Sequence, residues 1–146
     1  MEEDDNSFKP YVLKAYISLS YHKRQDLEQE VRTIKETLLG FAILPFVFVD
    51  NYHFHPSEER QMMQQALQDI DDCDILLAET SDKGIGIGIE AGFAKAKNKP
   101  VIYMRQKKAA HSTTVSGISD FQIVYESSND LQKQLSAVLE QIRNTP

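Results

Sequence analysis

The sequence contains a single cysteine, Cys73, among 146 residues, so it cannot form an internal disulfide. Cys73 comes just before an apolar run, which predicts a buried thiol in a reducing compartment. No apolar stretch has the length needed to cross a bilayer, and the first residues, MEEDDNS, are acidic where a secretion signal would be basic. We therefore expect a cytoplasmic protein that does not interact with membranes.

Basic residues are also scarce, because 16 Lys and Arg stand against 22 Asp and Glu and give a net charge of −6. They are scattered except at residues 22–24 and 105–108, so a long nucleic acid is not an expected partner. Each short cluster could hold one phosphate, although most such runs are solvated loop ends. The acidic run at the start of the chain predicts a disordered tail over residues 1–10. The length and the 41% hydrophobic content predict one folded domain over residues 11–146.

The apolar pattern predicts strands and helices in alternation. β-Branched and aromatic residues indicate strands over residues 11–19, 41–49, 74–78, 101–104 and 122–125. Helical spacing indicates helices over residues 25–39, 56–71 and 89–97 and a last helix capped by Ser128. Gly40 is expected to cap the first helix, and Pro45 indicates that the second strand lies near a sheet edge or is interrupted there. Residues 106–120 show no period and are expected to form a functional or interface loop.

This alternation is typical of a single-domain α/β fold of the Rossmann or flavodoxin-like kind. We expect a doubly wound, mainly parallel five-stranded sheet with helices on both faces. Ligands of such sheets bind beyond the carboxyl ends of the strands, where the strand order reverses. A site is therefore expected among the loops at residues 18–24, 50–55, 79–88 and 105–120.

The segment from Asp74 to Gly92 carries the clearest chemical signal. It joins a strand, a loop with glycines at positions 84, 86 and 88, and the expected first turn of a helix, which contains Glu90. Glycine permits a positive φ or the close approach of a ligand. A first-turn position favours the ionised form of a carboxylate, because the helix dipole and free N–H groups stabilise the anion. Such an anion can attack an anomeric carbon, as it does in retaining glycosidases.

Two other interpretations of this segment stay open. In the first, Glu90 is only a favourable first-turn acid behind a tight turn. In the second, Gly86-x-Gly88-x-x-Ala91 is a dinucleotide-binding fingerprint. The second match is weak, because the motif follows the third strand rather than the first and no suitable acid lies about 20 residues further on.

The same segment resembles the signature of the nucleoside 2-deoxyribosyltransferase-like superfamily, which includes the 2′-deoxynucleoside 5′-monophosphate N-hydrolases. In that superfamily an Asp opens the strand and a Gly-x-Gly-x-Glu-x-Gly motif follows. The matching residues here are Asp74, Gly86, Gly88, Glu90 and Gly92. The resemblance extends more loosely over residues 14–126. It implies that Glu90 is the nucleophile and that a homodimer or larger assembly shares its active sites.

The resemblance also implies a set of substrate-binding residues. These are Tyr16, Ser18, Ser20, Gly86, Gly88 and Ser112. The glycines would let the sugar approach, and Ser112 is similar to a serine that reaches the site of a neighbouring subunit. The three serines would donate hydrogen bonds to a 5′-phosphate, or the same pocket would hold a 5′-hydroxyl in a transferase.

Two positions depart from the superfamily pattern. Leu19 stands in the first loop where a glycine is usual, and Ala66 stands where the second helix usually has an Asp that helps proton transfer to the base. Asp69 lies three residues further on, on a neighbouring part of the same helix face, and is our candidate to substitute in part as proton donor; the alternative is that it is only a solvated helix acid. Alternative donors follow the second strand, namely Asp50, His53 and His55.

We therefore expect an enzyme, a nucleoside or nucleotide N-glycosidase or 2-deoxyribosyltransferase that acts through a covalent glycosyl-Glu90 intermediate. This mechanism needs no organic cofactor or metal, and His53-x-His55 with Asp50 lacks a third ligand for a metal site. One alternative is a nucleotide-binding module without catalysis, which Ala66 favours. Another is a TIR-like domain that cleaves NAD or docks onto proteins, which the run from Tyr16 to Ser20 suggests.

Overall fold

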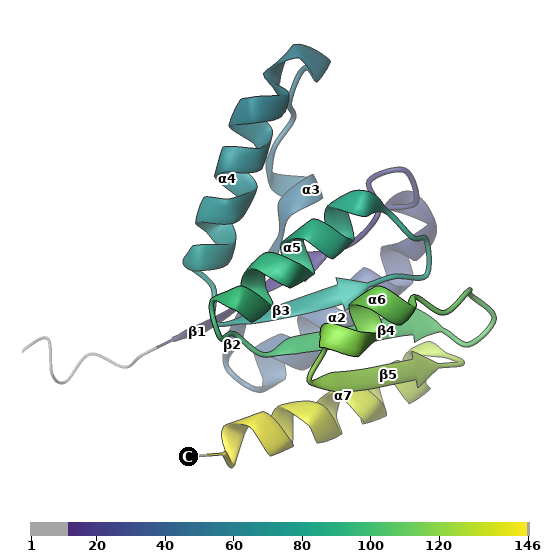
Figure 1. Ribbon diagram of the computed structural model, residues 1–146. Helices are drawn as coiled ribbons and strands as arrows, with labels where there is room; N and C mark the ends of the chain where they lie inside the picture. The colour runs from purple at the N-terminus through teal and green to yellow at the C-terminus, as the bar shows by residue number, and fades with distance from the viewer. Residues whose placement is uncertain (1–11, 146) are drawn as a thin grey trace, which may run out of the picture.

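The computed structural model describes residues 12–145, which contain one five-stranded sheet (Figure 1). Its strands are β1 (Leu13–Ser18), β2 (Ile43–Val47), β3 (Ile75–Glu79), β4 (Val101–Gln106) and β5 (Phe121–Tyr125). All neighbouring strands are parallel, and the order is β2-β1-β3-β4-β5. The predicted α/β class and five-stranded parallel sheet are therefore confirmed. The predicted acidic tail over residues 1–10 lies outside the described residues.

Helices cover both faces of the sheet. They are α2 (Glu28–Gly40), α3 (Phe48–Asn51), α4 (Glu59–Asp71), α5 (Ile85–Ala96), α6 (Thr113–Ile118) and α7 (Ser128–Arg143), with short 3-10 helices at Gln25–Leu27 and Pro56–Glu58. One core lies between the sheet and α2 and α7, and a second lies between the sheet and α4, α5 and α6 (Figure 1). The strand order reverses between β1 and β3, which predicts a ligand crevice at their carboxyl ends.

The apolar periods explain this layering. Val31, Ile34 and Leu38 form one buried stripe on α2, because residues three and four apart share a helix face. On α5 the buried residues Ala91 and Ala94 are small, which lets the helix pack closely on the sheet. Among the strands of residues 12–145, β2 pairs only with β1 and continues through Pro45, so the edge position predicted from this proline is confirmed and an interruption there is not found.

The ends of two helices differ from the sequence prediction. Gly40 is the last residue of α2 rather than its cap, and Ala42 adopts the left-handed conformation with φ 60°. The amides of Phe41 and Ala42 donate to the carbonyls of the preceding turn, which continues the helical path past the glycine. Helix α7 is capped by Ser127, whose hydroxyl accepts from the Asp130 amide, and not by Ser128.

Two further features bear on the expectations above. The segment 106–120 is not wholly irregular, because it contains α6, which is too short to show a helical period in the sequence. Cys73 is buried, as predicted. Within residues 12–145 no helix is both long and apolar enough to cross a membrane.

Candidate active site

Glu90 lies at the point where the strand order reverses. It belongs to α5, which follows β3, and its carboxylate points to β1. The Tyr16 hydroxyl donates to Oε2 at 2.9 Å, and the Ser18 hydroxyl donates to Oε1 at 2.5 Å. Both carboxylate oxygens are thus held by strand residues that are more than 70 positions away in the chain. The fold fixes the direction in which this carboxylate faces.

The pKa of Glu90 does not behave as the sequence suggested. Helix α5 begins at Ile85, so Glu90 lies in its second turn, beyond the free N–H groups of the helix start. Burial raises the pKa of Glu90 above its ordinary value of 4.5, and the hydrogen bonds from Ser18 and Tyr16 oppose this rise. The prediction that the helix start stabilises the ionised form of Glu90 is therefore wrong. Two hydroxyl donors favour the anion instead.

Replacement of Ser18 by alanine is expected to raise the pKa of Glu90 further. The Ser18 hydroxyl is the largest of the effects that lower this pKa, because its hydrogen bond favours the charged form. A carbon-13 NMR titration of the Glu90 carboxyl carbon would measure the change. Ser20→Ala, two residues along the same loop, is the matched control and should leave the titration unchanged. An unshifted Glu90 titration in Ser18→Ala would mean that the Ser18 hydroxyl does not stabilise the Glu90 anion.

Tyr16 has the environment of a hydrogen-bond donor rather than of an acid. Burial, followed by the charge of Glu90 and the hydrogen bond to it, raises the pKa of Tyr16. The phenol therefore keeps its proton and continues to donate to Glu90. Asp69 adds to the same rise, so its negative charge also reaches the Tyr16 hydroxyl.

Asp69 lies on α4, half-buried, with an incompletely satisfied carboxylate. Its Oδ1 accepts a hydrogen bond from Gln65 Nε2 at 3.0 Å. Its Oδ2 is buried and accepts no hydrogen bond from any described residue. Burial, followed by a hydrogen bond to the Asp69 carboxylate and the charge of that carboxylate, raises the pKa of the Tyr52 hydroxyl. Tyr52 is therefore the neighbour that faces this carboxylate, although no well-formed hydrogen bond reaches Oδ2 within residues 12–145.

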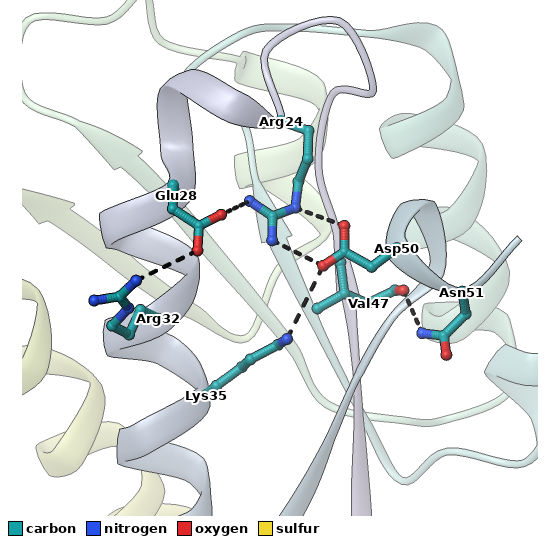
Figure 2. Close-up of polar contacts among 7 residues, drawn as sticks. All are labelled: Arg24, Glu28, Arg32, Lys35, Val47, Asp50 and Asn51. Carbon is teal, nitrogen blue, oxygen red and sulfur yellow. Dashed lines mark hydrogen bonds and ion pairs between the residues drawn. The ribbon is translucent and has the colours of Figure 1, made fainter.

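The alternative proton donors after β2 are placed differently, and Figure 2 shows one of them, Asp50. Arg24 Nε and Nη2 donate to Asp50 Oδ1 and Oδ2 at 2.7 and 2.8 Å, and Arg24 also pairs with Glu28. This fork occupies both oxygens of Asp50 and commits the Arg24 guanidinium to carboxylates. His55 is exposed and caps the short helix at Pro56–Glu58. No group of three or more His, Cys, Asp or Glu side chains in residues 12–145 is arranged to hold a metal ion.

Other predicted residues line a pocket of about 380 Å³ beside the start of α5. It is lined by Thr80, Lys83, Gly84, Ile85, Ile87, Gly88, Ser112, Thr114 and Val115. The structure thus brings Gly88 and Ser112 together. Glu90, Tyr16 and Ser18 do not line this pocket, because residues 88 and 90 project about 200° apart around a helix. One chain therefore holds the carboxylate on one flank of α5 and the serine pocket on the other.

The glycines lie inside a helix and not in a loop. Gly86 and Gly88 belong to α5, and none of the described glycines has a positive φ. Apart from its chain neighbours and the nearby backbone of its own helix, a Cβ at Gly86, Gly88 or Gly92 would meet no described atom within 4 Å. Each interior glycine costs a helix about 0.5–1 kcal/mol relative to alanine. Neither a tight turn nor internal packing accounts for these residues. A glycine pair inside a helix also does not fit a dinucleotide fingerprint, in which the first glycine makes the turn.

Comparison with known proteins identifies the family. The family model for nucleoside 2-deoxyribosyltransferase matches residues 16–138, which is most of the chain. The chain belongs to the nucleoside 2-deoxyribosyltransferase family. It is accordingly an enzyme of nucleoside or nucleotide glycosyl transfer in the broad sense, which includes hydrolysis. No curated protein sequence matches the chain.

Solved structures share the fold of this nucleoside 2-deoxyribosyltransferase family member at low sequence identity. A conserved protein from Enterococcus faecalis V583 is 16% identical, with a TM-score of 0.68 over 88% of this chain and 99% of that one. A 2-deoxyribosyltransferase from Bacillus psychrosaccharolyticus is 16% identical, with a TM-score of 0.64 over 86% and 95%. The CMP N-glycosidase BcmB from Clostridium botulinum is 17% identical, with a TM-score of 0.60 over 85% and 98%.

Sequence reasoning missed two residues around the site of this family member. Lys83 lines the serine pocket, but a single lysine in a loop carries no recognisable pattern. Glu79, at the end of β3, is only 1% exposed and accepts hydrogen bonds from the hydroxyls of Tyr125 and Ser81 and from the Ser81 amide. Burial raises its pKa, against these hydrogen bonds. The predicted strand ended one residue earlier, at Ala78, so no pattern marked Glu79.

Proposed function

We propose that this protein is a nucleotide N-glycosidase that cleaves the bond between a base and a (deoxy)ribose 5′-monophosphate through a covalent glycosyl-Glu90 intermediate. The observation that carries the proposal is the Glu90 carboxylate, held by Tyr16 and Ser18 at the reversal of strand order. Family membership supports the reaction class. The CMP N-glycosidase and the 2-deoxyribosyltransferase, which share the fold, act on related substrates.

In the proposed reaction Glu90 attacks C1′ of the sugar. A bond forms between a carboxylate oxygen and C1′ as the bond from C1′ to the base nitrogen breaks, and the base leaves with a proton supplied by Asp69. Water then attacks C1′ and gives a proton to Asp69, which the first step left as a carboxylate, while the bond from C1′ to Glu90 breaks and the sugar phosphate is released. In the transferase version a second base replaces the water. Burial of Glu90 helps this chemistry, since a poorly solvated anion is a stronger nucleophile.

The serine pocket beside α5 is the proposed binding site for the 5′-phosphate. Ser112 and Lys83 line it, whereas Ser20, buried after β1, is not among its lining residues. Ser112 and Lys83 supply neutral and cationic donors of the kind that phosphate oxygens accept. Ser18 donates to Glu90 in the structure, so its first role in this proposal is to hold the nucleophile. Gly86, one turn before Glu90 on the same flank of α5, leaves that surface open to an approaching sugar, whereas Gly88 lines the serine pocket.

A second copy of the chain is proposed to complete the site. Ile85, Ile89, Gly92 and Ala96 follow one another at spacings of four, three and four, and so form one stripe along α5. Ile85 is 85% exposed and Ile89 is 51% exposed, which is unfavourable for large apolar side chains on a monomer surface. Packing of this stripe against a second copy would let Ser112 of one chain approach Glu90 of the other. The dimer would bring the Glu90 flank of α5 in one chain close to the serine pocket of the other chain.

Replacement of Asp69 by asparagine is expected to lower kcat for base release about 10²- to 10³-fold, because asparagine cannot donate an acidic proton to the leaving base. Asp72→Asn is the matched control, since Asp72 is an exposed residue of the same helix region and also accepts from a glutamine four residues earlier. The control should keep the wild-type rate. An unchanged rate in Asp69→Asn would remove Asp69 from the mechanism and move the role to the loop after β2.

The function is tested by a substrate panel. The protein is incubated with nucleosides, their 5′-monophosphates and NAD, and free base is measured by chromatography. We expect base release from one or more monophosphates, and weaker release from the matching nucleosides. Release of nicotinamide alone would favour the TIR-like alternative. No release from any substrate would favour a binding module, for which the buried Ala66 in place of an acid is the main support.

The cytoplasm is the proposed location. The buried single thiol of Cys73 suits a reducing compartment, and nucleoside monophosphates are intracellular metabolites. The net charge of −6 is unfavourable for a long nucleic acid as substrate.

A further inference from the structure

Arg105, near the end of β4, has an unusual set of partners. Its Nη1 lies within hydrogen-bond distance of three main-chain carbonyls, those of Gln106 at 3.1 Å, Lys107 at 3.0 Å and Ala109 at 3.1 Å. Its Nε is buried and has no hydrogen-bond partner among residues 12–145. Within the same residues no carboxylate forms an ion pair with it. A half-buried cation without an anion is costly, so its presence calls for an explanation.

The carbonyls that Arg105 contacts belong to the segment 106–112, which ends at Ser112. Two positions before Arg105 on β4, and therefore on the same face of the sheet, Tyr103 is fully buried. The Tyr103 hydroxyl accepts a hydrogen bond from the Ser112 amide at 2.9 Å and lies 3.3 Å from His111 Nδ1. Arg105 thus holds the first half of this segment, and Tyr103 holds its end.

We infer that Arg105 and Tyr103 are positioning residues that set Ser112 for binding of the substrate 5′-phosphate. This inference rests on the proposed function of the serine pocket. Residues 107–112 contain no regular structure, so their shape depends on contacts made by side chains from elsewhere. All three carbonyl contacts converge on one nitrogen, Nη1, at the end of the Arg105 side chain. An ammonium can also contact more than one carbonyl, as Lys99 Nζ does with those of Asp71 and Cys73, so we expect Arg105→Lys to keep part of these contacts.

The test compares Arg105→Met and Arg105→Lys with Lys108→Gln. Lys108 is exposed in the same loop, so its replacement removes one positive charge without the carbonyl contacts. Each variant is assayed with a nucleoside monophosphate and with the matching nucleoside. For Arg105→Met we expect KM for the monophosphate to rise about tenfold with kcat within about twofold, since hydrogen bonds to a charged phosphate are lost. The nucleoside should be little affected, Arg105→Lys should recover the monophosphate KM only in part, and Lys108→Gln should behave as wild type.

Amide hydrogen exchange supplies a readout that does not need activity. Arg105→Met is expected to speed exchange of the amides at residues 107–112 while the strands stay protected. Tyr103→Phe removes one hydroxyl and leaves the ring, so it should speed exchange at Ser112 alone and raise KM in the same direction. This variant keeps the test available if Arg105→Met does not fold.

Three results would overturn the inference. The first is unchanged exchange in both variants, and the second is faster exchange with an unchanged monophosphate KM. The third is an equal rise in KM for Lys108→Gln, which would mean that charge and not loop geometry matters. Lack of base release by the wild-type protein would instead count against the proposed function, and the exchange experiment would still report whether Arg105 and Tyr103 hold the segment.

Discussion

Glu90→Ala is expected to lower the release of free base at least about 10⁴-fold, the scale on which removal of a nucleophile acts in other covalent enzymes. Alanine can neither attack C1′ nor stabilise positive charge that develops on the sugar ring. The fold should be retained, because Ile87, Ala91 and Ala94 form the core face of α5, whereas Glu90 is only partly buried at the flank of the helix. Chromatography of the base and thermal unfolding measure the two effects separately.

Glu36→Ala is a suitable control for that experiment. Glu36 is an exposed residue of α2, on the other face of the sheet, and its loss should leave base release unchanged. If Glu90→Ala kept most of the wild-type activity, Glu90 would not be the nucleophile. The hydrogen bonds from Tyr16 and Ser18 to Glu90 would then stabilise the fold without taking part in catalysis.

The second large effect is expected from Ile89→Asp. In the proposed dimer, the α5 stripe faces its own copy across a two-fold axis, so two carboxylates would be brought together in an apolar contact. The dimer should dissociate, and base release should fall about 100-fold or more, because Ser112 would no longer reach the partner's site. Analytical ultracentrifugation would report the change in mass, and circular dichroism would check the fold.

Leu39→Asp is the matched control for this variant. Leu39 is 54% exposed, close to the 51% of Ile89, but lies on α2 at the opposite face of the sheet. It should alter neither mass nor activity. A wild-type protein that is monomeric and fully active would refute the shared site, and an Ile89→Asp dimer would place the interface elsewhere.

The sheet was predictable because each strand and helix carries a local period. Val31, Ile34 and Leu38 mark a helix, and Pro45 marks the edge strand without knowledge of the rest of the chain. The start of α5 was not predictable in this way. Three alternate glycines have a poor intrinsic helix propensity, so residues 85–88 were assigned to a loop, and only packing on the sheet makes them helical.

The candidate site was predictable only in part. A motif pointed to Glu90 and Ser112, but the cradle made by Tyr16 and Ser18 joins residues 72 and 74 positions apart, which no local pattern encodes. The same limit explains the misjudged pKa. The sequence indicated a helix start near Glu90, whereas burial against β1, the dominant influence on this group, depends on the tertiary fold.

The stereochemistry of the reaction at C1′ tests the central claim most directly. Base release is carried out in water containing methanol, and the anomeric configuration of the methyl glycoside product is determined by NMR. Attack by Glu90 followed by attack of methanol inverts C1′ twice, so the product should keep the β configuration of the substrate. A product of inverted configuration would mean that the acceptor attacks the substrate directly, and would contradict a covalent glycosyl-Glu90 intermediate.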